Sequence, residues 1–218
     1  MELNGKKINF LGDSITEGVG VSTPDRIFWA LLGKATGATV RGYGISGSRI
    51  ARQLTPDVPV ARHDRHFATR VEEMDPDTDI IVVFGGTNDY GHGDAPLGTM
   101  ADREDGTFYG AMHDLCQKLP ARYPTATVVF VTPLHRIEEN KLINERGLRN
   151  VTGLEGYRAA IREVAAYYGM PVFNWEQTTG IQPEIPEVAA RYMPDGLHPN
   201  DAGHVIMAQQ LQHFLETI

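Results

Sequence analysis

The sequence has a single cysteine, Cys116, among 218 residues, so no disulfide can form within the chain. The longest apolar runs, such as IIVVF over residues 80–84, fall far short of the roughly 20 residues that a membrane-spanning helix needs. Positive charge is also scarce, because 20 Lys and Arg stand against 28 Asp and Glu and give a net charge of −8. This charge argues against nucleic acid or an anionic membrane as the main partner.

The first ten residues, MELNGKKINF, lack the apolar segment of a secretory signal. We therefore expect a cytoplasmic protein, with a secreted protein whose signal has been removed as the open alternative. Apolar residues make up 41% of the chain, which is typical of a globular protein. Because the chain shows no repeat and no low-complexity linker, we expect one domain over residues 1–218 and leave the oligomeric state open.

Five short segments have the composition of buried strands. The third and fourth are almost unbroken runs of β-branched and aromatic residues, as expected for strands of a parallel sheet that is covered on both faces. The predicted strands are Lys7–Gly12, Thr39–Ile45, Asp79–Gly86, Ala126–Thr132 and Met170–Asn174.

Helical patterns alternate with these strands. The first begins at Pro24, which suits the first helical position, and Thr23 before it can act as a cap. In the last, Met207, Leu211 and Leu215 share one apolar face. This alternation predicts an α/β fold with a doubly wound parallel sheet. The predicted helices are Pro24–Gly37, Ala61–Met74, Thr107–Arg122, Leu154–Tyr168 and Asp201–Ile218.

Two motifs contain the residue types of a serine nucleophile and its base. Ser14 stands directly after the first predicted strand, at the end where open α/β sheets build their sites. Asp195 and His198 stand just before the last helix, at a spacing that lets a carboxylate orient an imidazole toward a serine. Each motif also has a structural explanation, as a turn after a strand or as a capped helix start.

Two further motifs place hydrogen-bond donors at the same edge of the sheet. GYGISGSR, residues 42–49, follows the second strand, and its glycines expose backbone N–H groups. FGGTNDYG, residues 84–91, follows the third strand and contains the amide donor Asn88. Such donors can stabilise an oxyanion in acyl transfer, although a Gly-rich loop and an ordinary turn explain the two motifs as well.

In this order, the four motifs resemble those of the SGNH hydrolases, also called GDSL-type esterases and lipases. The resemblance spans nearly the whole chain and implies a flavodoxin-like three-layer α/β/α sandwich with a five-stranded parallel sheet of order 2-1-3-4-5. In that strand order the first strand lies between the second and the third, so the loops with Ser14, Gly47 and Asn88 are neighbours. Many members have asparagine where this chain has Gly42. The matching residues are GDSIT (12–16), ISG (45–47), GGTND (85–89) and DGLHP (195–199).

The resemblance also implies roles for single residues. Ser14 would be the nucleophile, His198 its general base and Asp195 the partner that orients the base. Gly47 and Asn88, together with the Ser14 backbone N–H, would form the oxyanion hole. The implied activity is hydrolysis of carboxylic esters through an acyl-enzyme, with no metal and no organic cofactor. We expect Asp13 to serve the loop structure rather than the chemistry.

We expect the substrate to be a small-molecule ester with a short acyl chain, such as an acetyl ester of a carbohydrate or a small lipid. Two long loops, Tyr90–Gly106 and Leu134–Gly153, stand near the motifs and offer few large apolar residues to receive a long chain. A thioesterase and a binding module for acylated ligands with little turnover stay open as alternatives. The second loop has four basic residues that can meet a polar or anionic alcohol group: Arg136, Lys141, Arg146 and Arg149.

Some residues that attract notice are given structural roles instead. His63 and His66 have the spacing of a metal pair, but no third ligand is evident, and we expect them on a solvated helix face. His92 follows Asn88 closely enough to line the pocket, and we expect it to be a loop residue rather than a metal ligand. Cys116 lies within a predicted helix with no activating neighbour and is expected to be a buried structural thiol.

Overall fold

The protein is described from a computed structural model over residues 1–56 and 60–218. Its centre is a parallel sheet of order β2-β1-β3-β4-β5, which confirms the predicted order 2-1-3-4-5. All predicted strands are present, and β5 is the most shortened of them. The strands are β1 (Lys7–Gly12), β2 (Thr39–Gly44), β3 (Ile80–Phe84), β4 (Thr127–Val131) and β5 (Val172–Phe173).

Alternate residues of β3 belong to two different apolar cores. Ile80 and Val82 pack into one cluster, whereas Ile81 and Val83 pack into the other. A strand covered on both faces needs an apolar side chain at every position, since successive side chains point to opposite sides. This double burial explains the unbroken apolar run of β3.

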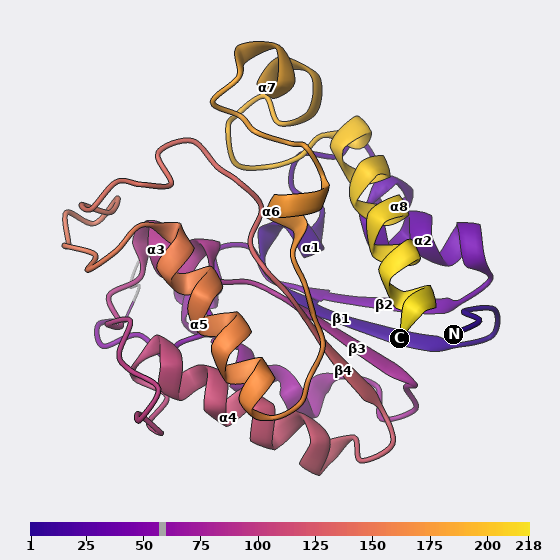
Figure 1. The fold of residues 1–218 in the computed structure, drawn as a ribbon, viewed down its shortest axis with the longest axis horizontal. Helices are drawn as coiled ribbons and strands as arrows, with labels where there is room; N and C mark the ends of the chain where they lie inside the picture. The colour runs from indigo at the N-terminus through magenta and orange to yellow at the C-terminus, as the bar shows by residue number, and fades with distance from the viewer. Residues whose placement is uncertain (57–59) are drawn as a thin grey trace.

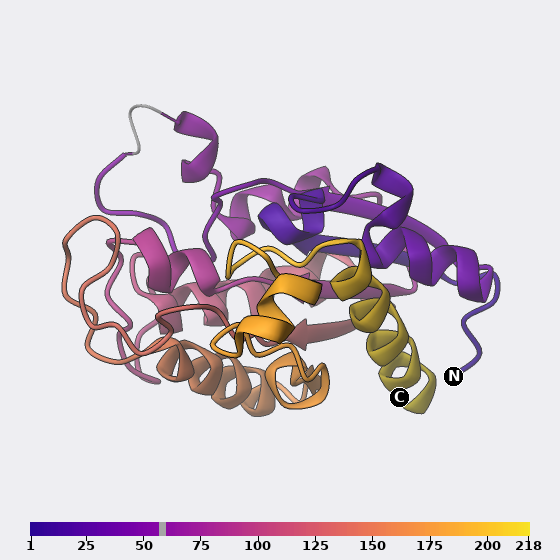
Figure 2. The same ribbon diagram turned by 90° about the horizontal axis from the view of Figure 1, so that it is seen from above.

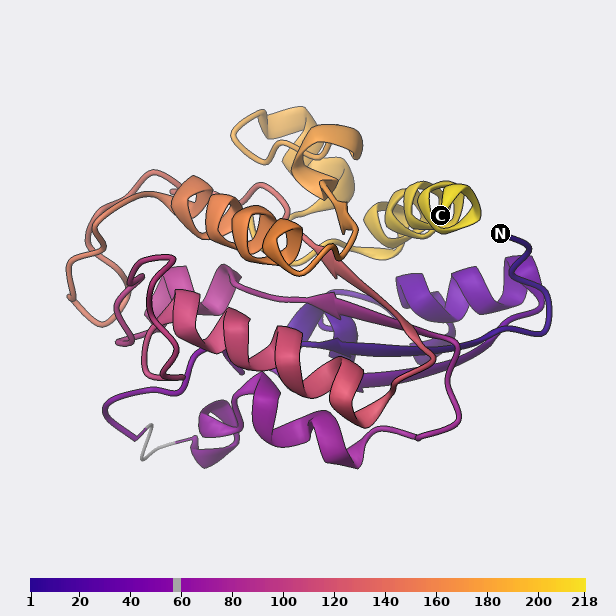
Figure 3. The ribbon, with the colours of Figure 1, turned by 60° about the horizontal axis from the view of Figure 1, so that its bottom comes forward.

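Two pairs of helices cover the two faces of the sheet, as the three-layer prediction requires. Helices α4 (Phe108–Arg122) and α5 (Leu154–Tyr167) pack together on one face, next to the 3₁₀ segment η3 (Phe67–Glu73). Helices α2 (Phe28–Thr36) and α8 (Asp201–Thr217) pair on the other face (Figure 1). The same two pairs are seen on either side of the strands in Figure 3.

Three short helices stand at the ends of strands. Helix α1 (Ser14–Glu17) follows β1, α3 (Thr87–His92) follows β3, and α6 (Trp175–Thr178) follows β5, so three of the turns at one edge of the sheet are helical. The other short segments, which lie away from the strand ends, are η1 (Pro24–Arg26), η2 (Ala61–Asp64) and α7 (Pro186–Tyr192).

The predicted helix over residues 61–74 is wrong. The chain forms the separate 3₁₀ segments η2 and η3, because His66 between them is extended, with φ −62° and ψ 158°. This extension lets the Phe67 N–H donate to the carbonyl of Arg49 over 3.0 Å. A tertiary hydrogen bond therefore replaces the continuous helix that the local pattern indicated.

The predicted helix over residues 24–37 is divided as well. Ile27, with ψ 141°, separates η1 from α2, and the Thr23 side chain makes no capping hydrogen bond to the backbone. The other helices are confirmed within a residue or two of their predicted ends. Thr107 caps α4 by accepting a hydrogen bond from the Gly110 N–H, and Asn200 caps α8.

The two predicted long loops differ in outcome. The first starts later than predicted, because α3 continues to His92. The second, residues 134–153, has no helix and only an isolated bridge between Ile143 and Arg149. It forms a broad excursion beside α3, at the left of Figure 2. Within residues 1–56 and 60–218, every helix falls short of the length or apolarity needed to cross a bilayer.

Candidate active site

The turn after β1 delivers Ser14 to the carboxyl edge of the sheet. Helix α1 begins at once, so Thr16 folds back over the strand end, and a Cβ on Gly12 would collide with the Thr16 hydroxyl. Asp13 caps the helix by accepting a hydrogen bond from the Ile15 N–H over 3.1 Å. Gly12 and Asp13 therefore allow α1 to start directly after β1, since Gly12 leaves room for Thr16 and Asp13 caps the helix. Ser14 is the first residue of that helix.

Ser14 lies in hydrogen-bond contact with His198. The Ser14 Oγ is 3.0 Å from His198 Nε2, and His198 Nδ1 is 2.7 Å from Asp195 Oδ2. The other Asp195 oxygen accepts hydrogen bonds from the backbone N–H groups of Leu197 and His198, at 2.9 and 2.7 Å. Asp195 is not a helix cap, since Asn200 caps α8. The turn therefore holds the imidazole with Nε2 facing the serine.

The Asp195 carboxylate is set up to stay ionised. Partial burial acts to raise its pKa, but the His198 N–H, the His198 ring and the Leu197 N–H all donate to it and together hold the pKa below the ordinary 3.8. A carboxylate that keeps its charge at neutral pH can stabilise a histidine that gains a proton.

The second and third loops meet beside Ser14, as the strand order predicts. Gly47 adopts φ +74°, and a Cβ at this position would collide with the ring of His63. Asn88, in α3, donates from Nδ2 to the carbonyl of Ser48 over 3.0 Å. The amide of Asn88 and the backbone next to Gly47 are thereby held against each other.

A buried arginine fixes the first loop against the second. Arg70 donates from Nη2 to the Gly12 carbonyl at 3.0 Å and to Ser48 Oγ at 3.2 Å, and from Nη1 to the Tyr43 carbonyl at 2.9 Å. The guanidinium carbon also lies 4.7 Å from the centre of the Phe67 ring. Nothing in the local sequence indicates this role, because Arg70 stands outside all four motifs.

Two buried carboxyl groups lie behind the site. Burial raises the pKa of Asp13 to about 7, against the Ile15 N–H and the charge of Arg70, which both lower it. Burial also raises the pKa of Asp89 to about 6, although this group accepts hydrogen bonds from the N–H groups of Ile50 and Ala51, each at 2.9 Å. Asp89 ties α3 to the second loop.

Gly42, the departure from the family pattern, has a structural reason. A Cβ at this position would overlap the indole of Trp29, whose Nε1 donates to the Thr16 carbonyl over 2.9 Å. The indole of Trp29 occupies the space that a side chain at position 42 would take.

His63 and His66 do not lie on a solvated helix face, and His92 does not lie in a loop. His66 is buried, with Nε2 3.4 Å from Asp105 Oδ2, so its predicted exposure is wrong. His63 is partly buried against Gly47. His92 belongs to α3 rather than to a loop, and its Nε2 lies 3.0 Å from Asn88 Oδ1. The contacts of His66 and His63 join residues that are distant in sequence and meet only in the fold. The contact of His92 with Asn88 requires that α3 extend over both residues.

No metal site accompanies them in the part of the chain that the structure describes, where no group of three or more His, Cys, Asp and Glu could hold an ion. Cys116 is buried in α4, as predicted, and burial raises the pKa of its thiol to about 12. Such a thiol stays protonated at neutral pH and is not a nucleophile.

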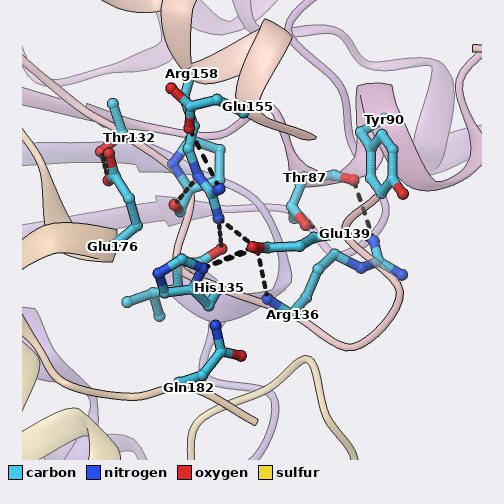
Figure 4. Close-up of polar contacts among 12 residues, drawn as sticks. Thr87, Tyr90, Thr132, His135, Arg136, Glu139, Glu155, Arg158, Glu176 and Gln182 are labelled. Carbon is cyan, nitrogen blue, oxygen red and sulfur yellow. Dashed lines mark hydrogen bonds and ion pairs between the residues drawn. The ribbon is translucent and has the colours of Figure 1, made fainter. Parts of the chain in front are cut away.

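A polar cluster holds the segment that follows β4. Glu139 accepts hydrogen bonds from His135 Nδ1 at 2.9 Å and from Arg158 Nη2 at 2.9 Å (Figure 4). Arg158 is 2% exposed and also donates to the carbonyls of Pro133 and Leu134. Burial acts to raise the pKa of Glu139, but His135 and Arg158 outweigh it and lower the pKa to about 2.

This segment supports the turn with the histidine. Ile137, two residues before Glu139, donates its N–H to the Gly196 carbonyl over 2.9 Å. Its side chain lies where a Cβ on Gly196 would be, and Gly196 has φ +77°. The Glu139–Arg158 pair therefore anchors the backbone on which the Asp195–His198 turn rests.

Most of the basic residues of the second long loop are paired within the protein. This arrangement leaves little free positive charge for an anionic substrate. The pairs are Arg136–Glu145 at 3.0 Å, Lys141–Glu138 at 2.9 Å and Arg146–Asp94 at 3.4 Å.

Comparison with known proteins places the chain in a family. Residues 10–206 match the model of the GDSL-like Lipase/Acylhydrolase family. A protein of known structure from Lactobacillus plantarum is 34% identical over 98% of each chain, with a TM-score of 0.82. No curated protein matches the chain.

Two more distant structures share the fold. The acetyl xylan esterase AlAXEase is 21% identical over 96% of this chain and 99% of that chain, with a TM-score of 0.65. The salicylyl-acyltransferase SsfX3 from a tetracycline biosynthetic pathway is 20% identical over 98% of this chain and 55% of that chain, with a TM-score of 0.67. By its motifs, its strand order and the match over residues 10–206, the chain belongs to the GDSL-like lipase/acylhydrolase family.

Proposed function

We propose that the protein is a serine esterase that hydrolyses carboxylic esters through an acyl-enzyme on Ser14. The observation that supports this proposal is the line of contacts from Ser14 Oγ to His198 Nε2, at 3.0 Å, and from His198 Nδ1 to Asp195 Oδ2, at 2.7 Å. Both distances are those of hydrogen bonds. The Ser14 proton can therefore pass directly to His198, which Asp195 holds in place.

In the first step, Ser14 Oγ attacks the acyl carbonyl and its proton passes to His198 Nε2. Asp195 stabilises the imidazolium that results. The carbonyl oxygen gains a negative charge, which the N–H groups of Ser14 and Gly47 and the amide of Asn88 would stabilise. The tetrahedral intermediate then collapses, and the leaving alkoxide takes the proton from His198.

Water completes the cycle. His198 removes a proton from a water molecule, whose oxygen attacks the acyl carbon and again forms a tetrahedral intermediate. This intermediate expels Ser14 Oγ, which recovers its proton from His198. The products are an alcohol and a carboxylic acid, and the enzyme returns to its starting state.

For the substrate, we propose a short acyl ester of an uncharged polar alcohol, such as an acetylated carbohydrate or a small lipid. The polar side chains next to the proposed oxyanion hole, His63 beside Gly47 and His92 beside Asn88, favour a small acyl group over a long chain. The internal pairing of the loop charges argues against an anionic alcohol. The acetyl xylan esterase that shares the fold is consistent with this substrate class.

Initial rates with p-nitrophenyl acetate test the proposal. We expect steady turnover by the wild-type protein and almost none by Ser14→Ala, whereas Ser22→Ala, which changes an exposed serine, should keep full activity. Acetyl-CoA serves as the second substrate. Faster turnover of acetyl-CoA than of the oxygen ester would make the protein a thioesterase, and binding without turnover of either would make it a binding module.

A further inference from the structure

The Asn88 carboxamide is held at both ends. Its Nδ2 lies 3.0 Å from the Ser48 carbonyl oxygen, and its Oδ1 lies 3.0 Å from His92 Nε2. The other ring nitrogen of His92, Nδ1, is hydrogen-bonded to Arg49 Nη2. These contacts form one continuous chain from Arg49 through His92 and Asn88 to the backbone beside Gly47.

The chemistry of the groups allows one arrangement of protons along this chain. A guanidinium only donates, so His92 Nδ1 must accept and the ring proton must sit on Nε2. That proton is then donated to Asn88 Oδ1. A carbonyl only accepts, so Asn88 must present Nδ2 to Ser48. The second Nδ2 hydrogen of Asn88 is then the one that can be offered to a substrate oxygen.

The arginine end of this hydrogen-bond chain is held in place by its surroundings. The Arg49 side chain is fully buried, and its Nη1 lies 3.8 Å from Asp64 Oδ1. The two residues after Arg49 donate their N–H groups to Asp89, on the same helix as Asn88 and His92. A buried positive charge at one end of a hydrogen-bond chain also polarises the bonds that follow, which strengthens the donor at the other end.

We propose that His92 is a positioning residue for the oxyanion hole, which fixes the orientation of the Asn88 amide and passes to it the polarisation from Arg49. This inference rests on the proposed function, since it takes Asn88 to donate to the oxyanion. His92 touches neither substrate nor nucleophile in this account. It acts through Asn88, so its effect is confined to the transition state, where the oxyanion exists.

Two conservative variants of His92 separate this role from a packing role. In His92→Gln the longer side chain places an amide nitrogen at about the reach of Nε2 and can still donate to Asn88. In His92→Asn the shorter side chain reaches only as far as Nδ1, so it can keep the contact with Arg49 but cannot reach Asn88. Both variants keep a polar side chain of moderate size in α3.

With p-nitrophenyl acetate, we expect His92→Asn to lower kcat by about 10-fold with KM changed by less than about 2-fold, whereas His92→Gln stays within about 3-fold of wild type. In the Asn88→Ala background, His92→Asn should cause no further loss. His113→Leu, which alters a buried histidine bonded to Tyr168 and Met100, is the control and should leave kcat unchanged.

The outcomes separate the inference from the proposed function. Equal loss in the Gln and Asn variants, or the same loss of kcat with and without the Asn88 amide, would overturn the role of His92. A normal kcat in Asn88→Ala would instead remove Asn88 from the oxyanion hole, and the inference would fall with it. A large loss in Asn88→Ala with a normal kcat in His92→Asn would leave the proposed function in place and refute the inference alone.

Discussion

Replacement of Asp13 by asparagine should stabilise the protein, and the gain should grow with pH. Asp13 is fully buried, and one of its carboxyl oxygens, Oδ2, has no hydrogen-bond partner in the part of the chain described here. Burial raises its pKa from the ordinary 3.8 to about 7. Asparagine has a similar shape, can accept the same hydrogen bond from the Ile15 N–H, and carries no charge to bury.

The direction of the change in stability with pH follows from the number of protons that the folded and the unfolded chain each bind. Below about pH 4 the carboxyl is protonated in both the folded and the unfolded chain, so its titration has no effect on stability. As pH rises toward 7, the unfolded chain releases this proton while the folded protein keeps it, and the wild-type protein loses stability. Above the folded pKa the loss is complete.

The magnitude comes from the two pKa values. A rise from 3.8 to about 7 corresponds to roughly 4 kcal/mol in total, since each pKa unit is worth about 1.36 kcal/mol. About 2 to 3 kcal/mol of this falls between about pH 5 and pH 8, the range in which the difference is to be measured.

Urea unfolding of wild type and Asp13→Asn across that pH range measures the effect. The difference in the free energy of unfolding should increase steadily with pH, because other titrating groups cancel between the two proteins. Asp25→Asn is the matched control, since Asp25 is exposed and a hydrogen bond from Thr23 lowers its pKa. A difference for Asp13→Asn that is independent of pH, or larger at acid pH, would refute the argument.

Two further expectations follow from the site and its support. Across p-nitrophenyl esters from acetate to palmitate, kcat/KM should be highest for acetate to butyrate, and a rise beyond octanoate would reveal an apolar channel. Arg158→Met should destabilise the protein by about 3–5 kcal/mol in urea, since it leaves the Glu139 carboxylate without its buried partner, and a loss below about 1 kcal/mol would contradict the anchoring role.

The sheet was predictable because its signals are local. The apolar runs of β3 and β4 show double burial in the sequence itself, and the four motifs stand directly at element ends. The 3₁₀ segments in place of a helix over residues 61–74 were not predictable, since the hydrogen bond from Phe67 to Arg49 that breaks the helix joins residues brought together only by the fold.

The same distinction applies to the candidate site. Ser14, Asp195 and His198 could be proposed because their order matches a known pattern, and the structure brings the three side chains together. Arg70 was missed altogether, and His92 was placed near the pocket without its contact to Asn88. Their roles depend on side-chain contacts with Ser48 and Asn88, and neither spacing nor composition encodes such contacts.

The most direct test of the central claim is covalent labelling of the nucleophile. The wild-type protein is treated with a serine-directed phosphonate, and the site of modification is identified by mass spectrometry of its peptides. The phosphonate should add to Ser14 alone and abolish ester hydrolysis in proportion to labelling, while Ser14→Ala should take up no label. Labelling at another residue, together with hydrolysis by Ser14→Ala, would contradict the account.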